Sequence, residues 1–369
     1  MSSNHHCELP MSRPSLVRIA SALLVLSLAS VPLASAGTNE APFPTAAALC
    51  HHTAIAEEGF VPIGGIEQWV TIHGAHCDSP VVLFIHGGPG NPLSPFAAKV
   101  YGSWESRFTL VQWDQRGAGK TFGHNPGSAQ ASLSIEQMSQ DGIALAQYLT
   151  AHLGQKKIIL MGSSWGSVLA VHMAMARPDL FYAYVGSSQL VDGEQNASAA
   201  YRQALDRARR IGDTGSVTKL VALGAPPWTD PHSFGALRRI TRRYEASAST
   251  AAPADWWQPA PAYTGTSVQQ EEDAGEDYSY LQYVGKDGHG MFWQINLPAL
   301  GGEFRIPVFL VQGAEDLNTV PPMTKHYFDT LHAPQKAYVL VPHTGHDPNV
   351  AMVDAQYRLL IQRVLPLTK

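Results

Sequence analysis

The stretch 160-LMGSSWGSVLAVHMA-174 changes from a strand-like run to a helix-like run within a few residues. The apolar residues before it are typical of a buried strand, and the composition after it favours a helix. Between the two runs, GSSWG (162–166) places Ser164 between two glycines. A Cβ at either glycine would crowd a sharp turn, so the pattern predicts a turn that lifts the Ser164 hydroxyl above the sheet. Ser163 is one residue out of the pattern, and we expect it to be structural.

A serine hydroxyl is too weak an acid to attack a carbonyl unaided, so a histidine base and an orienting carboxylate are needed later in the chain. Asp316 follows the strand-like run VFLVQG, and His346 follows YVLVPH. Both would lie beyond the carboxyl ends of strands, where open α/β sheets build their sites. We therefore predict a catalytic triad of Ser164, Asp316 and His346, in that chain order. Glu315 and His343 are the close rivals, and their loop positions favour them less.

Acyl transfer also needs hydrogen-bond donors for the oxyanion that forms on the attacked carbonyl. The backbone N–H of Trp165, at the start of the predicted helix, is one expected donor. The glycine turn HGGPG (86–90) directly follows the run VVLFIH, and we expect it to bring the backbone N–H of Gly88 to the same oxygen. An ordinary tight loop is the alternative interpretation of HGGPG, but it leaves the position of the turn beside the strand unexplained.

Seven apolar runs predict strands, and helical patterns lie between them. The later runs are nearly continuous in apolar residues, which is typical of strands buried on both faces. A helix is predicted over residues 134–154, where the capping pattern SxxQ opens the segment. The alternation predicts an α/β fold with a mostly parallel sheet flanked by helices. The strand-like runs are residues 66–74, 81–86, 108–114, 157–163, 182–188, 306–313 and 337–343.

A long interval between two of these runs breaks the alternation. Residues 194–212 and 233–246 have a helical composition that is rich in Ala and Arg. Residues 247–265 are rich in Ser, Thr, Ala and Pro, which is typical of a flexible segment. The predicted division is a core of residues 37–189 and 306–369 and a helical cap of residues 190–305.

The N-terminal segment has the pattern of a secretory signal peptide. Two arginines precede an apolar run that closes on 34-ASA-36, so we predict removal of residues 1–36. The mature protein would then be secreted or periplasmic, with no stable membrane association. Export would leave Cys50 and Cys77 in an oxidising compartment, either as a disulfide or as two free thiols.

Charge and cysteine usage bear on the expected partners. The formal net charge of −5 provides no basic field of the kind that nucleic acid or anionic lipid selects. The sequence has no cysteine spacing typical of a metal site. We expect a peptide or small-molecule substrate, no nucleic acid, no metal and no cofactor. The sequence leaves the oligomeric state open.

Three motifs taken together, HGGPG (86–90), WDQRGAGKT (113–121) and GSSWGS (162–167), resemble those of the proline iminopeptidase family of α/β hydrolases. The resemblance runs from about residue 60 to the C terminus, although in the predicted cap it is one of length and helical character. It implies an α/β-hydrolase fold with a mainly helical cap inserted after the sixth strand. It also implies release of an N-terminal residue, preferably proline, from peptides by the serine, aspartate, histidine and oxyanion donors named above, without metal or cofactor.

The chain departs from the family pattern in the second motif, where the family usually has Ser at the position of Lys120 or Thr121. In the same motif, we expect Asp114 and Arg116 to form a structural ion pair that holds the loop near the site.

The resemblance further implies cap carboxylates that bind the free amine, because a cationic proline nitrogen taken from water needs a negative partner. Glu194, at the head of the first predicted cap helix, is the expected amine-binding residue. The acidic run 271-EEDAGED-277 is the other source of cap carboxylates for the amine, but we favour its interpretation as a solvated loop. In an alternative interpretation, the protein uses the same triad as an esterase or amidase that acts on small acyl substrates. A binding protein on a hydrolase fold is a third possibility.

The cap aromatics that could line an apolar pocket are Trp228, Trp256, Trp257, Tyr278, Tyr280 and Trp293.

Overall fold

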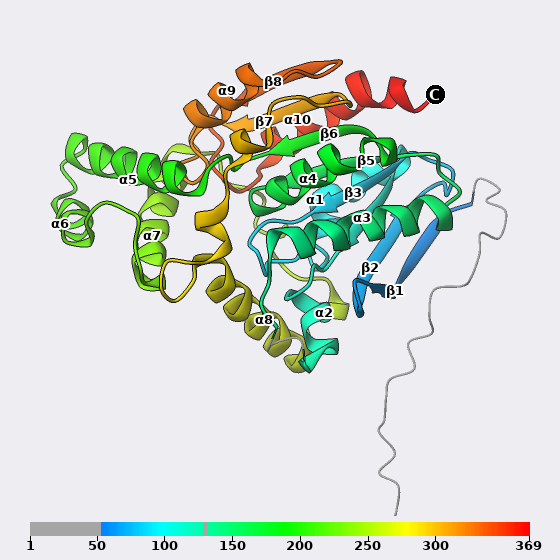
Figure 1. The fold of residues 1–369 in the computed structure, drawn as a ribbon, viewed down its shortest axis with the longest axis horizontal. Coiled ribbons are helices and arrows are strands. Elements are labelled where there is room, and N and C mark those ends of the chain that lie inside the picture. Colours follow the sequence, from blue (N-terminus) through cyan, green and yellow to red (C-terminus); the bar gives the residue numbers. More distant parts are fainter. Residues whose placement is uncertain (1–52, 128–130) are drawn as a thin grey trace, which may run out of the picture. The chain divides into compact units, whose positions relative to one another are not determined.

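One eight-stranded sheet forms the centre of the protein in the computed structural model, which describes residues 53–127 and 131–369 (Figure 1). The strands are β1 (Ile55–Ile63), β2 (Ile66–Gly74), β3 (Val81–Ile85), β4 (Thr109–Trp113), β5 (Ile158–Ser163), β6 (Phe181–Ser187), β7 (Val308–Gly313) and β8 (Lys336–Val341). Their order across the sheet is β1-β2-β4-β3-β5-β6-β7-β8. The β1–β2 and β2–β4 pairings are antiparallel, and every pairing from β4 to β8 is parallel. The predicted mostly parallel sheet is confirmed.

Helices cover both faces of the sheet, because successive side chains of a buried strand point to opposite sides. The helices of this part are α1 (Ala97–Tyr101), α2 (Gly119–His124), α3 (Ile135–His152), α4 (Trp165–Ala176), α9 (Pro321–Thr330) and α10 (Val350–Leu359). In β3, Leu83 and Ile85 belong to the apolar core shared with α3, α4 and α9. Val82 and Phe84 belong to the opposite core, shared with α1 and α10. Strands β3 to β7 are therefore buried on both faces, as their composition predicts. The same prediction is wrong for β8, which lies at the edge of the sheet and has only one fully buried residue.

All seven strand predictions are confirmed, with ends that differ from the observed ones by two residues at most. The predicted helix is α3, and its N-cap Ser134 accepts a hydrogen bond at 3.1 Å from the backbone N–H of Gln137. The sequence analysis missed β1, whose sequence IAEEGFVPI contains two adjacent glutamates. This strand pairs on one side only, and an edge strand tolerates charged side chains that a central strand would exclude.

Between β6 and β7 the chain forms the helices α5 (Gly193–Arg210), α6 (Thr214–Leu223), α7 (Pro231–Ala248) and α8 (Thr266–Val284). Figure 1 shows α5, α6 and α7 beyond one end of the sheet and α8 beside α2. The two predicted cap helices correspond to α5 and α7, whereas α6 and α8 were not predicted. The interpretation of residues 271–277 as a loop is wrong, because they lie within α8. One face of α8 packs on the core, where the Ser279 hydroxyl donates to the carbonyl of Gly117 at 2.7 Å.

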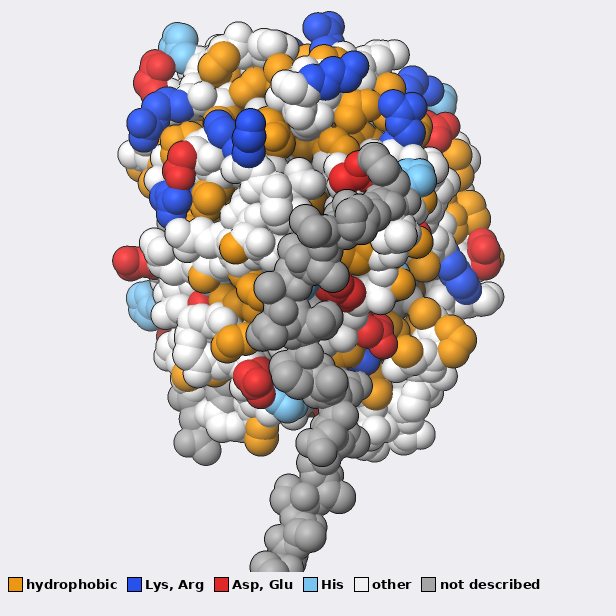
Figure 2. Space-filling model, turned by 90° about the vertical axis from the view of Figure 1, so that its right-hand side faces the viewer, with side chains coloured by type: hydrophobic (Ala, Val, Ile, Leu, Met, Phe, Trp, Pro, Cys, Tyr) orange, Lys and Arg blue, Asp and Glu red, His pale blue; other side chains and the backbone are white. Residues whose placement is uncertain are grey.

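The predicted signal peptide, residues 1–36, and Cys50 lie outside the described residues. Cys77 is disulfide-bonded. In residues 53–127 and 131–369, no helix has both the length and the apolar composition needed to cross a bilayer. The same residues contain no cluster of three or more His, Cys, Asp or Glu side chains able to hold a metal ion. On the face shown in Figure 2, charged side chains of both signs are interspersed with apolar ones.

The turn between β5 and α4 depends on two glycines, as the sequence predicts. A Cβ on Gly162 would lie 2.6 Å from the carbonyl oxygen of Gly166 and 2.8 Å from Cβ of Ala170. A Cβ on Gly166 would lie 2.0 Å from the carbonyl oxygen of Ile85 and 2.5 Å from that of His86. Real Cβ atoms do not approach backbone oxygens so closely, so only glycine lets the start of α4 lie against the end of β3.

Replacement of Gly166 by alanine should therefore separate α4 from β3 and move the turn. We expect Gly166→Ala to lower the free energy of unfolding by about 3 kcal/mol or more, measured by urea denaturation. Gly215→Ala is the matched control, because a Cβ at this exposed position in α6 would meet its nearest neighbour, an Asp213 oxygen, at 3.6 Å. Equal stability of the two variants would show that the close approach is not a constraint.

Candidate active site

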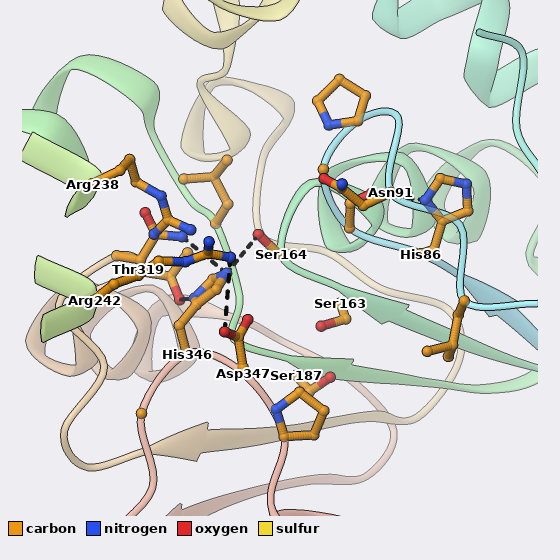
Figure 3. A pocket seen from close by; sticks show the side chains of 18 of the residues that line it. His86, Asn91, Ser163, Ser164, Ser187, Arg238, Arg242, Thr319, His346 and Asp347 are labelled. Atoms are coloured by element: carbon orange, nitrogen blue, oxygen red, sulfur yellow. Dashed lines mark hydrogen bonds and ion pairs between the residues drawn. The ribbon is translucent and has the colours of Figure 1, made fainter. Parts of the chain in front are cut away.

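Ser164 occupies the turn in a backbone conformation that few non-glycine residues adopt. Its φ is 52° and its ψ is −121°, and it is the N-cap residue of α4. Such a conformation costs on the order of 1–3 kcal/mol and persists only where the surrounding structure holds it. Here the close contacts of Gly162 and Gly166 hold it. The turn projects the Ser164 side chain into a cavity, as Figure 3 shows.

The structure brings Ser164, His346 and Asp316 together, although they lie far apart in the sequence. The Ser164 Oγ atom lies 3.0 Å from Nε2 of His346. On the other side of the ring, Nδ1 lies 3.1 and 3.2 Å from the two carboxylate oxygens of Asp316. Asp316 is 1% exposed and His346 is 8% exposed. A serine hydroxyl, an imidazole and a buried carboxylate in this order can transfer a proton away from the serine.

Hydrogen bonds saturate the Asp316 carboxylate. Oδ2 accepts from the Thr319 hydroxyl at 2.6 Å and from the Gln312 amide at 2.8 Å. Oδ1 accepts from the backbone N–H groups of Asn318 and Thr319, each at 2.8 Å. Burial opposes ionisation, but His346 and these hydrogen bonds together hold the pKa of Asp316 below its ordinary value. The carboxylate is therefore charged at neutral pH and fixed in orientation.

The charge of Asp316 also acts on His346. Burial alone would lower the pKa of His346, but the carboxylate raises it above its ordinary value. The side-chain amide of Asn318 also lies 2.9 Å from Nε2 of His346. An amide nitrogen can only donate, so this contact requires that Nε2 of His346 is unprotonated. The ring proton then sits on Nδ1 and faces Asp316. This tautomer is the one that a base for Ser164 needs.

The two rival residues lie apart from this arrangement. Glu315 is partly exposed and approaches Arg207 at 4.0 Å. His343 is exposed. The structure therefore places Asp316 and His346, rather than Glu315 and His343, beside Ser164.

The three sequence motifs that carry the family resemblance are joined through Gln115. Its side-chain amide donates to the carbonyl of His86 at 2.9 Å, and its side-chain oxygen accepts from the indole of Trp165 at 3.2 Å. Its backbone N–H donates to Nε2 of His86 at 3.2 Å, which leaves the ring proton on Nδ1 to donate to the carbonyl of Gly87 at 2.7 Å. Burial lowers the pKa of His86 to about 4, so the ring is neutral. The sequence analysis quoted Gln115 within a motif but assigned it no role.

The two predicted oxyanion donors lie at the ends of this network. Gly88 lines the cavity and has a φ of 109°, a value that favours glycine. Trp165 is the first residue of α4 and is fully buried. Their roles as hydrogen-bond donors to a substrate stay a prediction.

The predicted ion pair between Asp114 and Arg116 is wrong. Arg116 instead contacts Asp141 of α3, with Nε 2.8 Å from Oδ2. Asp114 accepts hydrogen bonds from the Ser94 hydroxyl and, at 3.0 Å, from the backbone N–H of Lys120. The two side chains are close in sequence, but Arg116 pairs with a residue of α3, and Asp114 binds Ser94 and a backbone N–H of its own motif. Both interactions still brace the loop beside the site.

A cavity of about 1200 Å³ surrounds the Ser164 hydroxyl. The core supplies the 86–89 turn and the loops that follow β5, β7 and β8, and the cap supplies α7 and α8. Of the cap aromatics singled out from the sequence, only Trp257 and Tyr280 line it. The other aromatic residues of the wall, which the sequence analysis did not single out, are Phe84, Phe96, Tyr101, Phe234, Tyr283 and Phe292.

The structure does not place Glu194 in this cavity. Glu194 is exposed on the first turn of α5 and lies outside the cavity lining. The carboxylates that do line it are Glu245, Glu276 and Asp347. Glu276 belongs to the acidic run that the sequence singled out, but no sequence signal distinguished Glu245.

Glu245 joins the cap to the loop that carries Asp316. It lies on α7, is 5% exposed, and accepts a hydrogen bond at 2.6 Å from the backbone N–H of Leu317. Burial, together with the negative charge of Asp316, raises the pKa of Glu245 to about 7. This carboxyl group therefore changes its charge near neutral pH.

The architecture and the serine site together define a hydrolase class. A family model described as alpha/beta hydrolase fold matches residues 80–350, and the chain belongs to that family. Within it, the chain is similar to proline iminopeptidases. The probable aminopeptidase YbaC of Bacillus subtilis (strain 168) is 28% identical over 294 residues, which are 78% of this chain and 90% of that protein. A probable proline iminopeptidase of Leptolyngbya boryana is 24% identical over 321 residues, which are 83% of this chain and 95% of that protein.

A solved structure agrees with this assignment of the fold. The crystal structure of proline iminopeptidase from Mycobacterium smegmatis has a TM-score of 0.57 to this chain, at 16% identity. The alignment covers 84% of this chain and 98% of that one.

The raised pKa of Glu245 predicts a pH dependence of stability. In the folded protein this carboxyl group holds its proton up to about pH 7, whereas its ordinary pKa is 4.5. The folded state is therefore penalised as pH rises from 4.5 through 7, and the penalty is complete above 7. Glu245→Gln removes the ionisation but keeps an oxygen for the Leu317 N–H. We expect this variant to gain stability relative to wild type by on the order of 2 kcal/mol between pH 5 and pH 8, measured by urea denaturation. A stability difference that is constant or that shrinks with pH would contradict the assignment.

Proposed function

We propose that the protein is an exported serine aminopeptidase that releases an N-terminal residue, preferably proline, from short peptides. The observation that carries the proposal is the 3.0 Å approach of Ser164 Oγ to His346 Nε2, backed by Asp316, in a cavity that the cap helices α7 and α8 help to line. The similarity to proline iminopeptidases supports the choice of substrate class. The signal-peptide pattern of residues 1–36 supports export.

The proposed reaction begins when His346 takes the proton of the Ser164 hydroxyl as its oxygen attacks the carbonyl carbon of the first residue. The backbone N–H groups of Gly88 and Trp165 then stabilise the oxyanion of the tetrahedral intermediate. His346 returns the proton to the leaving amine, which departs and leaves an ester on Ser164. A water molecule, deprotonated by His346, hydrolyses this acyl-enzyme. Asp316 stays ionised throughout and stabilises the protonated imidazole.

The free amine of the substrate needs a negative partner, and the geometry favours Glu276 over the sequence-predicted Glu194. Glu276 lines the cavity on α8, and a Cβ on Gly90 would lie 2.9 Å from its Cα. It therefore sits against the 86–90 turn that supplies the proposed oxyanion donor Gly88. The amine of the first residue lies one carbon from the attacked carbonyl, so a carboxylate beside this turn is suitably placed.

The proposal is tested by comparing substrates on the purified protein. We expect cleavage of proline and alanine anilides, and loss of turnover when the substrate amine is acetylated, because the amine is part of the recognition. Short-chain aryl esters serve as the comparison. Activity on esters alone, or equal activity on free and acetylated anilides, would reject the aminopeptidase and leave an esterase or amidase with the same triad.

Replacement of the nucleophile should abolish turnover without loss of the fold. We expect Ser164→Ala to lower kcat by several orders of magnitude while substrate binding is largely retained, measured by steady-state kinetics and by calorimetry. Ser163→Ala, one residue earlier, is the matched control and should lower kcat by less than about fivefold. Substantial turnover by Ser164→Ala would show that another group is the nucleophile.

A further inference from the structure

One wall of the cavity is cationic, and the proposed mechanism does not use it. Arg238, Arg239 and Arg242 of α7 all line the cavity. Arg238 and Arg242 are one helical turn apart, so their side chains leave the same face of α7. Figure 3 shows both side chains directed toward the space above His346 and Ser164. Two guanidinium groups thus face the reacting atoms.

Arg238 has a donor without an acceptor. Its Nη1 atom is buried and has no hydrogen-bond partner among the described residues. A buried guanidinium nitrogen is seldom left unpaired, because desolvation of a charged donor is costly. Burial lowers the pKa of Arg238, although the nearby carboxylate of Glu245 opposes the shift. Arg238 lines the cavity, so a rotation of its guanidinium group would bring this unpaired donor to an acceptor supplied by a ligand.

The positive charge of Arg238 and Arg242 on this wall suits a ligand group that carries one negative charge. Arg242 approaches Asp347 at 3.9 Å, but both side chains are more than 60% exposed, so this pair leaves most of the positive charge available. Glu245, on the same helix, is about half protonated at neutral pH. The planar guanidinium group pairs well with a carboxylate through two parallel hydrogen bonds. A doubly charged phosphate would face Glu276 and Asp347 as well, which also line the cavity.

The position of the arginines relative to the triad identifies which end of the substrate they meet. In Figure 3, Arg238 and Arg242 lie on the His346 side of Ser164, whereas His86 and Asn91, from the oxyanion turn and the residues after it, lie on the opposite side. His346 must deliver its proton to the leaving amine, so the part of the peptide beyond the scissile bond lies on the His346 side. The arginines therefore face the leaving group rather than the first residue.

We propose that Arg238 and Arg242 bind the C-terminal carboxylate of a short peptide, so that the enzyme prefers dipeptides and tripeptides with a free carboxylate. This inference rests on the proposed aminopeptidase function and names its substrate class more closely. A cavity of about 1200 Å³ is large enough for a peptide of this length.

The test compares matched peptides that differ only at the C terminus. Pro-Gly and Ala-Gly are assayed as free acids and as C-terminal amides, together with an alanine anilide that has no carboxylate. We expect wild-type kcat/KM to be about tenfold or more higher for the acid than for the amide, through a lower KM. In Arg238→Gln and Arg242→Gln this ratio should fall at least fivefold. Any effect of these variants on the pKa of His346 acts on both peptides and cancels in the ratio.

Arg210→Gln, an exposed position at the end of α5, changes the net charge equally and should keep the wild-type ratio. Arg242→Gln keeps the test valid should Arg238→Gln fold poorly, because the Arg242 side chain is 64% exposed. Cleavage of the anilide and the amide with no preference for the acid would overturn the inference and leave the aminopeptidase function standing. Cleavage of esters alone would reject both the aminopeptidase function and the inference that rests on it.

A second comparison, of Glu-Gly amide with Gln-Gly amide, tests whether the arginines instead bind the side chain of the first residue. A preference for Glu-Gly amide that is lost in Arg238→Gln would place the carboxylate on the acyl side and overturn the proposal.

Discussion

The backbone at the start of α4 lies so close to the end of β3 that a single methyl group at Gly166 would lie 2.0 Å from the carbonyl oxygen of Ile85. This approach leaves the chain only a sharp turn between β5 and α4, and Ser164 takes the positive φ that the turn requires. A nucleophile held in this way needs no lid or ligand to orient it. The loops after β7 and β8 then have only to bring Asp316 and His346 to a fixed point, and both loops leave the same edge of the sheet because β5 to β8 are parallel.

Gln115 holds the segments around Ser164 in place. Its side chain bridges the carbonyl of His86 and the indole of Trp165, so the oxyanion turn and the start of α4 are braced against one residue of the loop after β4. The neutral state of His86 belongs to the same hydrogen-bond network. A protonated ring could not accept the backbone N–H of Gln115, and burial keeps the pKa of His86 at about 4. The motifs that carry the family resemblance are thus parts of one hydrogen-bonded structure rather than three separate signals.

Features set by neighbouring residues could be predicted from the sequence, and features set by packing could not. The glycines of GSSWG, the strand runs and the order of Ser164, Asp316 and His346 all follow from local chemistry and chain order. The partner of Arg116 could not be predicted in this way, because Asp141 lies on another element and only the fold brings it near. The same holds for Glu245 and Arg238, which look like ordinary charged positions of an amphipathic helix. Glu194 was favoured for its position at a helix start, yet α5 leaves it exposed.

The helix α7 links the charge of the cavity wall to the triad. Its middle carries Arg238 and Arg242 on the wall, and one turn further on Glu245 accepts a hydrogen bond from the backbone of Leu317, the residue after Asp316. A shift of α7 that improved contact with a substrate would therefore move the acceptor that holds the Asp316 loop. Because the Asp316 carboxylate is fixed by four hydrogen bonds from Gln312, Asn318 and Thr319, the loop resists such a shift. The cap wall and the triad are consequently positioned together.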